Sequence, residues 1–158
     1  MNMKREKIIQ IGIAVKDLEK SLEFYYKTLG TGSWDIHELN SQTMRDATYR
    51  GKQSDWSALV AVTWIGDRQL ELMQPLKGPN LYYDFLEKKG EGIQHIKFWV
   101  DDCQKRIEEY SKKGITVIQS GKYDEDEFYY LDTEPILGFI LEVGNNGKVR
   151  PPIKRYPE

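Results

Sequence analysis

Four polar side chains interrupt apolar stretches of this chain, and their chemical types suit the binding of a metal ion. The four are Gln10, Glu71, His95 and Glu142. Together they offer two carboxylates, an amide oxygen and an imidazole nitrogen, an oxygen-rich set that favours octahedral coordination of a divalent cation. Singly, each is expected to be an ordinary polar residue on the solvent face of a strand. They gain a joint role only if the fold brings them into one trough.

Hydrophobic periodicity predicts the elements that would position these side chains. Residues 7–15 alternate between apolar and polar or small side chains, which indicates a strand. Asp17 occupies an N-cap position, apolar residues then recur at helical spacing from Leu18, and Gly30 ends the predicted helix. A strand, a capped helix and a terminating glycine therefore form the first unit.

The same unit returns 85 residues further along the chain, the offset from Gln10 to His95. At this offset the matched pairs are Ile11 and Ile96, Val15 and Val100, Asp17 and Asp102, Lys20 and Lys105, Glu23 and Glu108, Tyr25 and Tyr110, and Lys27 and Lys112. Amphipathicity would reproduce the apolar pairs but not the charged ones. We therefore interpret the chain as two copies of one unit.

Convergence of the two copies would give the four polar side chains a common trough. Gly12 and Ala14 share the strand face of Gln10 and leave room above it. Two carboxylates in such a trough are costly unless they are protonated or paired with a cation. No lysine or arginine stands at a matching strand position in both copies. We therefore expect one divalent metal ion there, with Zn, Ni, Co, Mn and Mg all left open.

Further short strands complete an α+β architecture of two βαβββ modules that form a curved mixed sheet around a central cleft. The predicted strands cover 34–39, 48–49, 58–65 and 69–74 in the first module and 116–120, 127–131 and 139–143 in the second. One domain would span 1–158, with module one at 7–75, a linker helix at 79–90, module two at 91–144 and a tail at 145–158. Residues 40–56 are expected to be a long loop over the cleft, and the tail an extended surface arm.

Composition excludes several classes of protein. The 158 residues carry a net charge of −2, which gives no broad electrostatic footprint for nucleic acid. The single cysteine, Cys103, excludes a disulfide framework and a cysteine-based zinc cluster, and we expect it in the core. No apolar run approaches the roughly 20 residues of a membrane span. A soluble, cytoplasmic protein is expected.

Two segments resemble the glyoxalase and bleomycin-resistance, or vicinal-oxygen-chelate, superfamily. They are residues 9–20 with Phe24 and Tyr25, and residues 90–96 followed by Val100, Asp101 and Asp102. Within it, the second segment and residues 71–76 look most like methylmalonyl-CoA epimerase and its relatives. The resemblance implies metal ligands at Gln10, Glu71, His95 and Glu142, and a homodimer.

Two departures from the family patterns keep the reaction open. Epimerases of this type usually carry histidine where Gln10 stands, whereas eukaryotic glyoxalase I carries glutamine there. Residues 72–75, Leu-Met-Gln-Pro, lack the Asn-Trp-Gly pattern of the glutathione-dependent glyoxalase I. Ring-cleaving dioxygenases use two histidines and one carboxylate, so Gln10 argues against that chemistry.

The chemistry consistent with this set is proton abstraction next to a carbonyl, with Glu142 as the base and Glu71 as the acid on the other face. Asp55 is a weaker candidate for that acid. The substrate would be an acyl-CoA, most like methylmalonyl-CoA, or an α-keto or hemithioacetal compound, and Lys4, Arg5 and Lys7 could meet CoA phosphates. The alternatives are a glyoxalase-I-like lyase and a metal-free protein that binds a small molecule or antibiotic.

Other residues receive simpler interpretations. His37 is expected at the surface, and the acidic run 124–127 in a solvated loop. Trp56, Trp64 and Trp99 could line the trough, although strand tryptophans more often serve packing.

Overall fold

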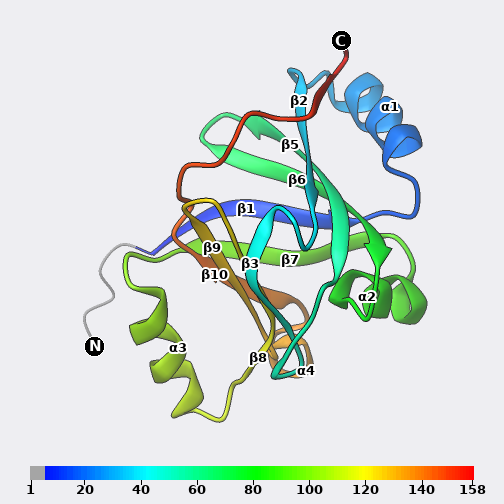
Figure 1. Ribbon diagram of the computed structural model, residues 1–158. Helices are drawn as coiled ribbons and strands as arrows, with labels where there is room; N and C mark the ends of the chain where they lie inside the picture. The colour runs from blue at the N-terminus through cyan, green and yellow to red at the C-terminus, as the bar shows by residue number, and fades with distance from the viewer. Residues whose placement is uncertain (1–5) are drawn as a thin grey trace.

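The computed structural model describes residues 6–158, whose strands form one curved mixed sheet (Figure 1). In chain order the elements are β1 (Lys7–Ala14), α1 (Leu18–Leu29), β2 (Trp34–Leu39), β3 (Met44–Tyr49), β4 (Lys52–Gln53), β5 (Ser57–Ile65), β6 (Arg68–Lys77), α2 (Leu81–Lys89), β7 (Gly92–Trp99), α3 (Cys103–Ser111), β8 (Val117–Tyr123), β9 (Asp126–Leu131), α4 (Glu134–Leu137), β10 (Ile140–Gly144) and β11 (Lys154–Tyr156). The predicted α+β class is confirmed. None of the helices in the described part of the chain is long and apolar enough to cross a membrane.

Local chemistry explains why the two units fold alike. The Asp17 carboxylate accepts a hydrogen bond from the Lys20 amide at 3.1 Å, and Asp102 accepts one from the Lys105 amide at 3.0 Å. Each bond satisfies a backbone donor that the first helical turn leaves free. Gly30, with φ of +61°, ends α1 in the left-handed conformation.

The sheet has a pseudo-two-fold arrangement about its centre. β1 and β7 pair antiparallel, while β6 runs parallel to β1 and β10 runs parallel to β7. The order outward is β1-β6-β5-β2 on one side and β7-β10-β9-β8 on the other. The first strands of the two copies are therefore neighbours, and the residues on them meet across the middle of the sheet.

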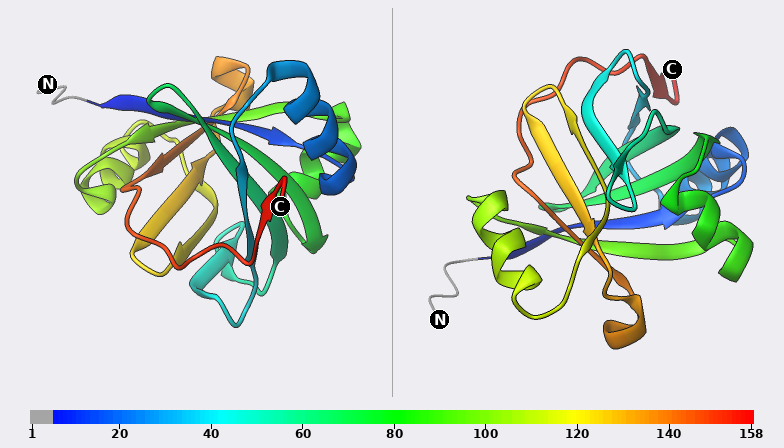
Figure 2. Two further views of the ribbon diagram at one scale, coloured as in Figure 1. Left: turned by 90° about the horizontal axis from the view of Figure 1, so that it is seen from above. Right: turned by 60° about the horizontal axis from the view of Figure 1, so that its bottom comes forward.

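The strands at the two ends of the sheet, β3 and β4 at one and β11 at the other, correct the sequence-based expectations. Residues 40–56 contain the β3–β4 hairpin rather than a long loop, and β3 pairs with β8 of the second copy. The tail is extended but carries β11, which pairs with β2 of the first copy. Figure 2 shows both crossing segments. Backbone groups of an edge strand need partners, and backbone pairing leaves little signal in side-chain periodicity. The short helix α4 was likewise not predicted.

Strand alternation separates the core into outer and inner parts. α1 and α3 cover the outer face, where Leu22 and Leu72 belong to one cluster and Cys103 and Leu131 to another. Cys103 is buried there, as expected. On the inner face, α2 and an aromatic group that includes Trp56, 0% exposed, fill one end of the trough. The polar residues occupy the rest of that face.

Candidate active site

The registers of the central strands place the polar residues in two adjacent rows. In the first row, Gln69, Gln10, Lys97, Glu142 and Tyr130 are successive cross-strand partners on β6, β1, β7, β10 and β9. In the second row, Glu71, Gly12 and His95 are partners on β6, β1 and β7. Because alternate residues of a strand share a face, both rows point into the trough.

The tips of the four sequence-predicted ligands converge. Nε2 of His95 lies 3.0 Å from Oε1 of Gln10, 2.9 Å from Oε2 of Glu142 and 3.5 Å from Oε2 of Glu71. Oε1 of Gln10 also lies 3.3 Å from each of the two carboxylate oxygens. His95 is 0% exposed and Glu142 3%. The structure therefore brings all four side chains to one point.

The backbone and a neighbouring amide set the orientation of His95. Nδ1 of His95 lies 3.1 Å from Oε1 of Gln94, whose Nε2 donates to the Leu81 carbonyl at 3.3 Å. Nδ1 therefore carries the proton that this oxygen accepts. The imidazole lies over Gly12, where any Cβ would overlap the ring. Nε2 is left facing oxygen atoms, which attract it only if a proton or a cation lies between them.

The residues present fit a divalent ion by donor type and by spacing. Adjacent ligands of an octahedral ion with bonds of about 2.0–2.1 Å lie about 3 Å apart, close to the separations of the tips. Within residues 6–158 no group of three or more His, Cys, Asp or Glu side chains is by itself arranged as a metal site. The fit therefore depends on the amide oxygen of Gln10 as the fourth donor. Turned by 180°, the Gln10 amide would donate from its nitrogen to both carboxylates, whereas with its oxygen inward it would serve as a ligand of a cation.

Two charged residues of the site were missed in the sequence. Lys97, with its side chain 4% exposed, has Nζ 3.5 Å from Oε1 of Glu142 and 3.7 Å from Oδ1 of Asp126. The expectation that no matched cation faces the carboxylates overlooked Lys97, because its counterpart in the first copy is Gly12. Its position between Ile96 and Phe98, two residues after His95, was a usable signal. Asp126 belongs to the acidic run expected to be solvated, and this expectation was wrong for that residue.

Burial and neighbouring charges shift the pKa values of Glu71 and Glu142 in opposite directions. Burial raises the pKa of Glu71 to about 7, against the opposing effect of His95. Burial also disfavours the Glu142 carboxylate, but Lys97 and His95 outweigh it, so the pKa of Glu142 is lowered. Carboxylates whose pKa values are driven apart are suited to acid and base roles.

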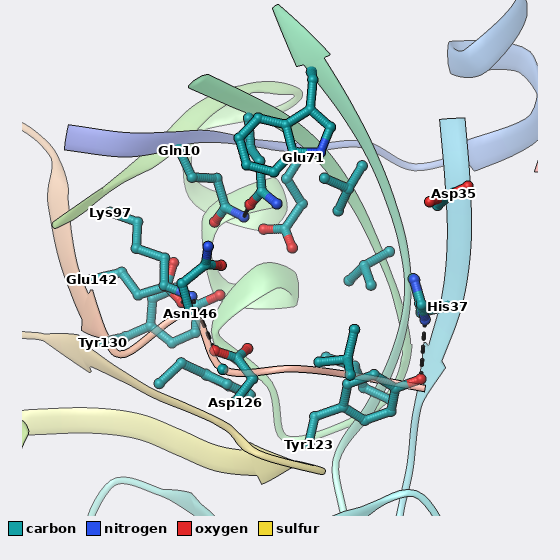
Figure 3. A pocket seen from close by; sticks show the side chains of 18 of the residues that line it. Gln10, Asp35, His37, Glu71, Lys97, Tyr123, Asp126, Tyr130, Glu142 and Asn146 are labelled. Carbon is teal, nitrogen blue, oxygen red and sulfur yellow. Dashed lines mark hydrogen bonds and ion pairs between the residues drawn. The ribbon is translucent and has the colours of Figure 1, made fainter. Parts of the chain in front are cut away.

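The trough opens into a pocket of about 300 Å³ (Figure 3). His37 lines its opposite wall, is buried, and has Nδ1 3.1 Å from the hydroxyl of Tyr123. The expectation that His37 lies at the surface was wrong, because β5 and the second module cover β2. The tail contributes Asn146 and Val149 to the lining.

The remaining sequence candidates fall in different places. Trp64 lines the pocket, Trp56 packs in the core, and Trp99 donates through Nε1 to the Asn145 carbonyl. Asp55 is exposed, forms an ion pair with Lys77 and does not line the pocket.

Residues 9–130 match the model of the Glyoxalase/Bleomycin resistance protein/Dioxygenase superfamily. The chain belongs to this superfamily. Among curated proteins, the uncharacterized protein YqjC of Bacillus subtilis (strain 168) is 29% identical over 108 residues, 68% of this chain and 67% of that protein. Mouse mitochondrial methylmalonyl-CoA epimerase is 26% identical over 106 residues, 66% of this chain and 52% of its own length.

Solved structures agree on the superfamily fold. Hypothetical protein BH1468 from Bacillus halodurans C-125 superposes with a TM-score of 0.71 at 25% identity, covering 93% of this chain and 99% of that one. Methylmalonyl-CoA epimerase from Mycobacterium tuberculosis gives 0.63 at 21%, covering 87% and 85%. A methylmalonyl-CoA epimerase in complex with methylmalonyl-CoA and NH4+ gives 0.64 at 24%, covering 93% and 99%. At 21% and 24% sequence identity, the two epimerase structures support a shared fold alone.

Proposed function

We propose that this chain is a metal-dependent enzyme that removes a proton from the carbon next to a carbonyl group. The convergence of Gln10, Glu71, His95 and Glu142 carries the proposal, because a buried and a largely buried carboxylate meet an amide and an imidazole at one point. These four residues would hold one divalent ion. When bound, such an ion would polarise the substrate carbonyl and stabilise the negative charge that develops on its oxygen.

The chain's own residues divide the proton transfers between them. Glu142, whose pKa is lowered, is ionised near neutral pH and would act as the base. Glu142 would shift from the ion to the substrate proton as it acts, and Glu71, which burial disfavours as an anion, would return a proton on the opposite face. General acid and base catalysis of this kind typically contributes about 10²–10⁴-fold in rate. The buried walls around His95 would keep water from competing for the proton.

Epimerisation of an acyl-CoA of the methylmalonyl type is the first candidate reaction. Its support is the similarity to the mouse epimerase, although the match spans only about half of that protein. Lys4 and Arg5, suggested as partners of CoA phosphates, lie outside the described residues. A homodimer in the cytoplasm stays a prediction from the resemblance and the composition.

A glyoxalase-I-like lyase is the second candidate. The observation that favours it is the donor set itself, since glutamine at position 10 is the residue the resemblance associates with glyoxalase I rather than with epimerases. A metal-free binding protein of the same fold would lack any need for two converging carboxylates.

Solvent proton exchange tests the proposed chemistry. Purified protein would be loaded with each candidate metal and incubated in D2O with methylmalonyl-CoA, or with the hemithioacetal of methylglyoxal. We expect deuterium to enter one substrate and expect Glu142→Gln to reduce the rate by at least about 10²-fold. Glu108→Gln, an exposed change on α3, is the matched control. An unchanged exchange rate in Glu142→Gln would refute the role of Glu142. Substrate binding by the metal-free protein equal to that of the metal-loaded protein would refute the requirement for a metal.

A further inference from the structure

Lys97 is buried and Asp126 is largely buried beside Glu142, and their hydrogen-bonding capacity is not filled by the groups around them. The Lys97 ammonium carries three donors, yet its nearest carboxylate oxygens lie 3.5 and 3.7 Å away, at or beyond the limit of a hydrogen bond. Oδ1 of Asp126 has no hydrogen-bond partner among the described residues. A buried polar atom left unsatisfied costs about 1–3 kcal/mol, so Oδ1 of Asp126, beside the weakly paired ammonium of Lys97, leaves a place for a further hydrogen-bonding group.

The fold directs both groups into the pocket. The stem of Lys97 crosses Gly144, where an added Cβ would lie only 2.7 Å from Cε of Lys97. Lys97 is the cross-strand partner of Glu142, and Asp126 begins the neighbouring strand β9. Figure 3 shows both side chains on the wall of the pocket that Glu142 occupies. Their separation of 3.7 Å lets one oxygen atom lie about 2.8–3.0 Å from each.

The charges restrict the group that can complete this pair. A group that only accepts hydrogen bonds, such as a carboxylate, would satisfy Lys97 but would be repelled by Asp126. A hydroxyl group can accept from Lys97 and donate to Asp126 at the same time.

We propose that Lys97 and Asp126 form a subsite that binds a hydroxyl group of the substrate. This inference rests on the proposed function and narrows its substrate class to 2-hydroxy carbonyl compounds, in which the carbon that loses the proton carries the hydroxyl group. The hemithioacetal of methylglyoxal has such a hydroxyl group, and methylmalonyl-CoA does not. Lys97 and Asp126 determine specificity by hydrogen bonding to the hydroxyl group. Glu142 remains the base that removes the proton.

Two hydroxamates that differ by one hydroxyl group test the subsite. Glycolohydroxamate and acetohydroxamate both chelate divalent metals through the hydroxamate group. Only glycolohydroxamate carries a hydroxyl group on the carbon next to its carbonyl. Isothermal titration of each into the metal-loaded chain measures the preference. We expect the wild type to bind glycolohydroxamate about tenfold more tightly, as for a hydrogen bond to a charged group, and expect Lys97→Met to abolish the preference. Lys122→Met, in an ion pair outside the pocket, is the matched control.

A charge-balanced variant keeps the test valid if Lys97→Met does not fold. Lys97→Met with Asp126→Leu removes one charge of each sign and both hydroxyl partners, and it should bind the two hydroxamates equally. Equal binding by the wild type would overturn the inference and indicate that the pair holds a water molecule only. A preference that survives in the double variant would also overturn it. Failure of both hydroxamates to bind would instead contradict the proposed metal site.

Discussion

Gly12 shows how one residue without a side chain makes the site possible. Its neighbour across the strands is His95, and the imidazole occupies the space where a Cβ would stand. The ring can therefore lie close against β1, with Nδ1 held by Gln94 and Nε2 directed at Gln10 and Glu142. The position of His95, in the second copy, thus depends on Gly12 in the first copy.

Gly12→Ala is expected to displace the imidazole without unfolding the chain. Overpacking in a core typically costs about 1–3 kcal/mol, and the shifted ring would weaken binding of a divalent ion by at least about tenfold. Metal titration together with thermal unfolding would measure both effects. Gly32→Ala, where an added Cβ meets nothing within 4 Å, is the control. Metal affinity equal to that of the wild type would contradict the role of Gly12.

Among the elements, the tail acts as a bridge between the two copies. Residues 145–158 leave β10, contribute Asn146 and Val149 to the pocket, and end in β11 on β2. Arg150 holds the middle of this bridge, since its guanidinium pairs with Asp124 at 2.8 Å and lies over the ring of Tyr123. The pocket wall at this side therefore depends on a contact outside the metal-ligand set.

The attachment of the tail should respond to pH through Asp124. Hydrogen bonds from Arg150 lower the pKa of Asp124 to about 2. Because the folded pKa lies below the ordinary value of 3.8, the contact stabilises the chain above about pH 4 and is lost as the pH falls through about 2. Hydrogen exchange of residues 149–156 should therefore accelerate, relative to β1, over that interval.

The variant Asp124→Asn distinguishes the loss of the Asp124–Arg150 contact from the other effects of low pH on the fold. Asparagine tolerates the φ of +54° at this position, so the backbone should be preserved. We expect the variant to show fast exchange in residues 149–156 already at pH 7 and no further acceleration specific to the tail. Identical tail protection in the variant and the wild type at pH 7 would show that Asp124 does not hold it.

The whole molecule is one sheet to which each copy adds a strand at the other's edge. β3 from the first copy extends the second, and β11 from the tail of the second extends the first. The four converging side chains are divided in the same way, with Gln10 and Glu71 from one copy and His95 and Glu142 from the other. Binding at that point would therefore couple the stability of the two halves.

Divalent metal should raise the unfolding temperature of the entire chain in one transition. A ligand present at 100 times its Kd stabilises the native state by about 2.7 kcal/mol, which corresponds to roughly 5–10 °C for a chain of this size. Differential scanning calorimetry after treatment with a chelator, then with each metal added back, would measure the shift. Glu142→Gln should reduce it strongly. Two separate transitions, or no shift with any metal, would contradict this expectation.

The sequence by itself determined the repeated unit, its capped helices and the strand faces on which Gln10, Glu71, His95 and Glu142 lie. These features depend on interactions between residues close in the chain, such as the Asp17 cap, or on strand alternation. The α+β class follows from the same local patterns. The superfamily came from the resemblance of residues 9–20 and 90–96 to its members, and the match over residues 9–130 confirms it.

Only the tertiary structure decided which side chains share the pocket. His37 and Asp126 approach it because β2 and β9 are curved around the trough, and the hairpin and tail reach opposite edges by backbone pairing. Backbone hydrogen bonds join strands far apart in sequence and require no particular side chain at most positions, so periodicity could not reveal them. Lys97 could have been placed on the site face from alternation, but its contact with Asp126 could not.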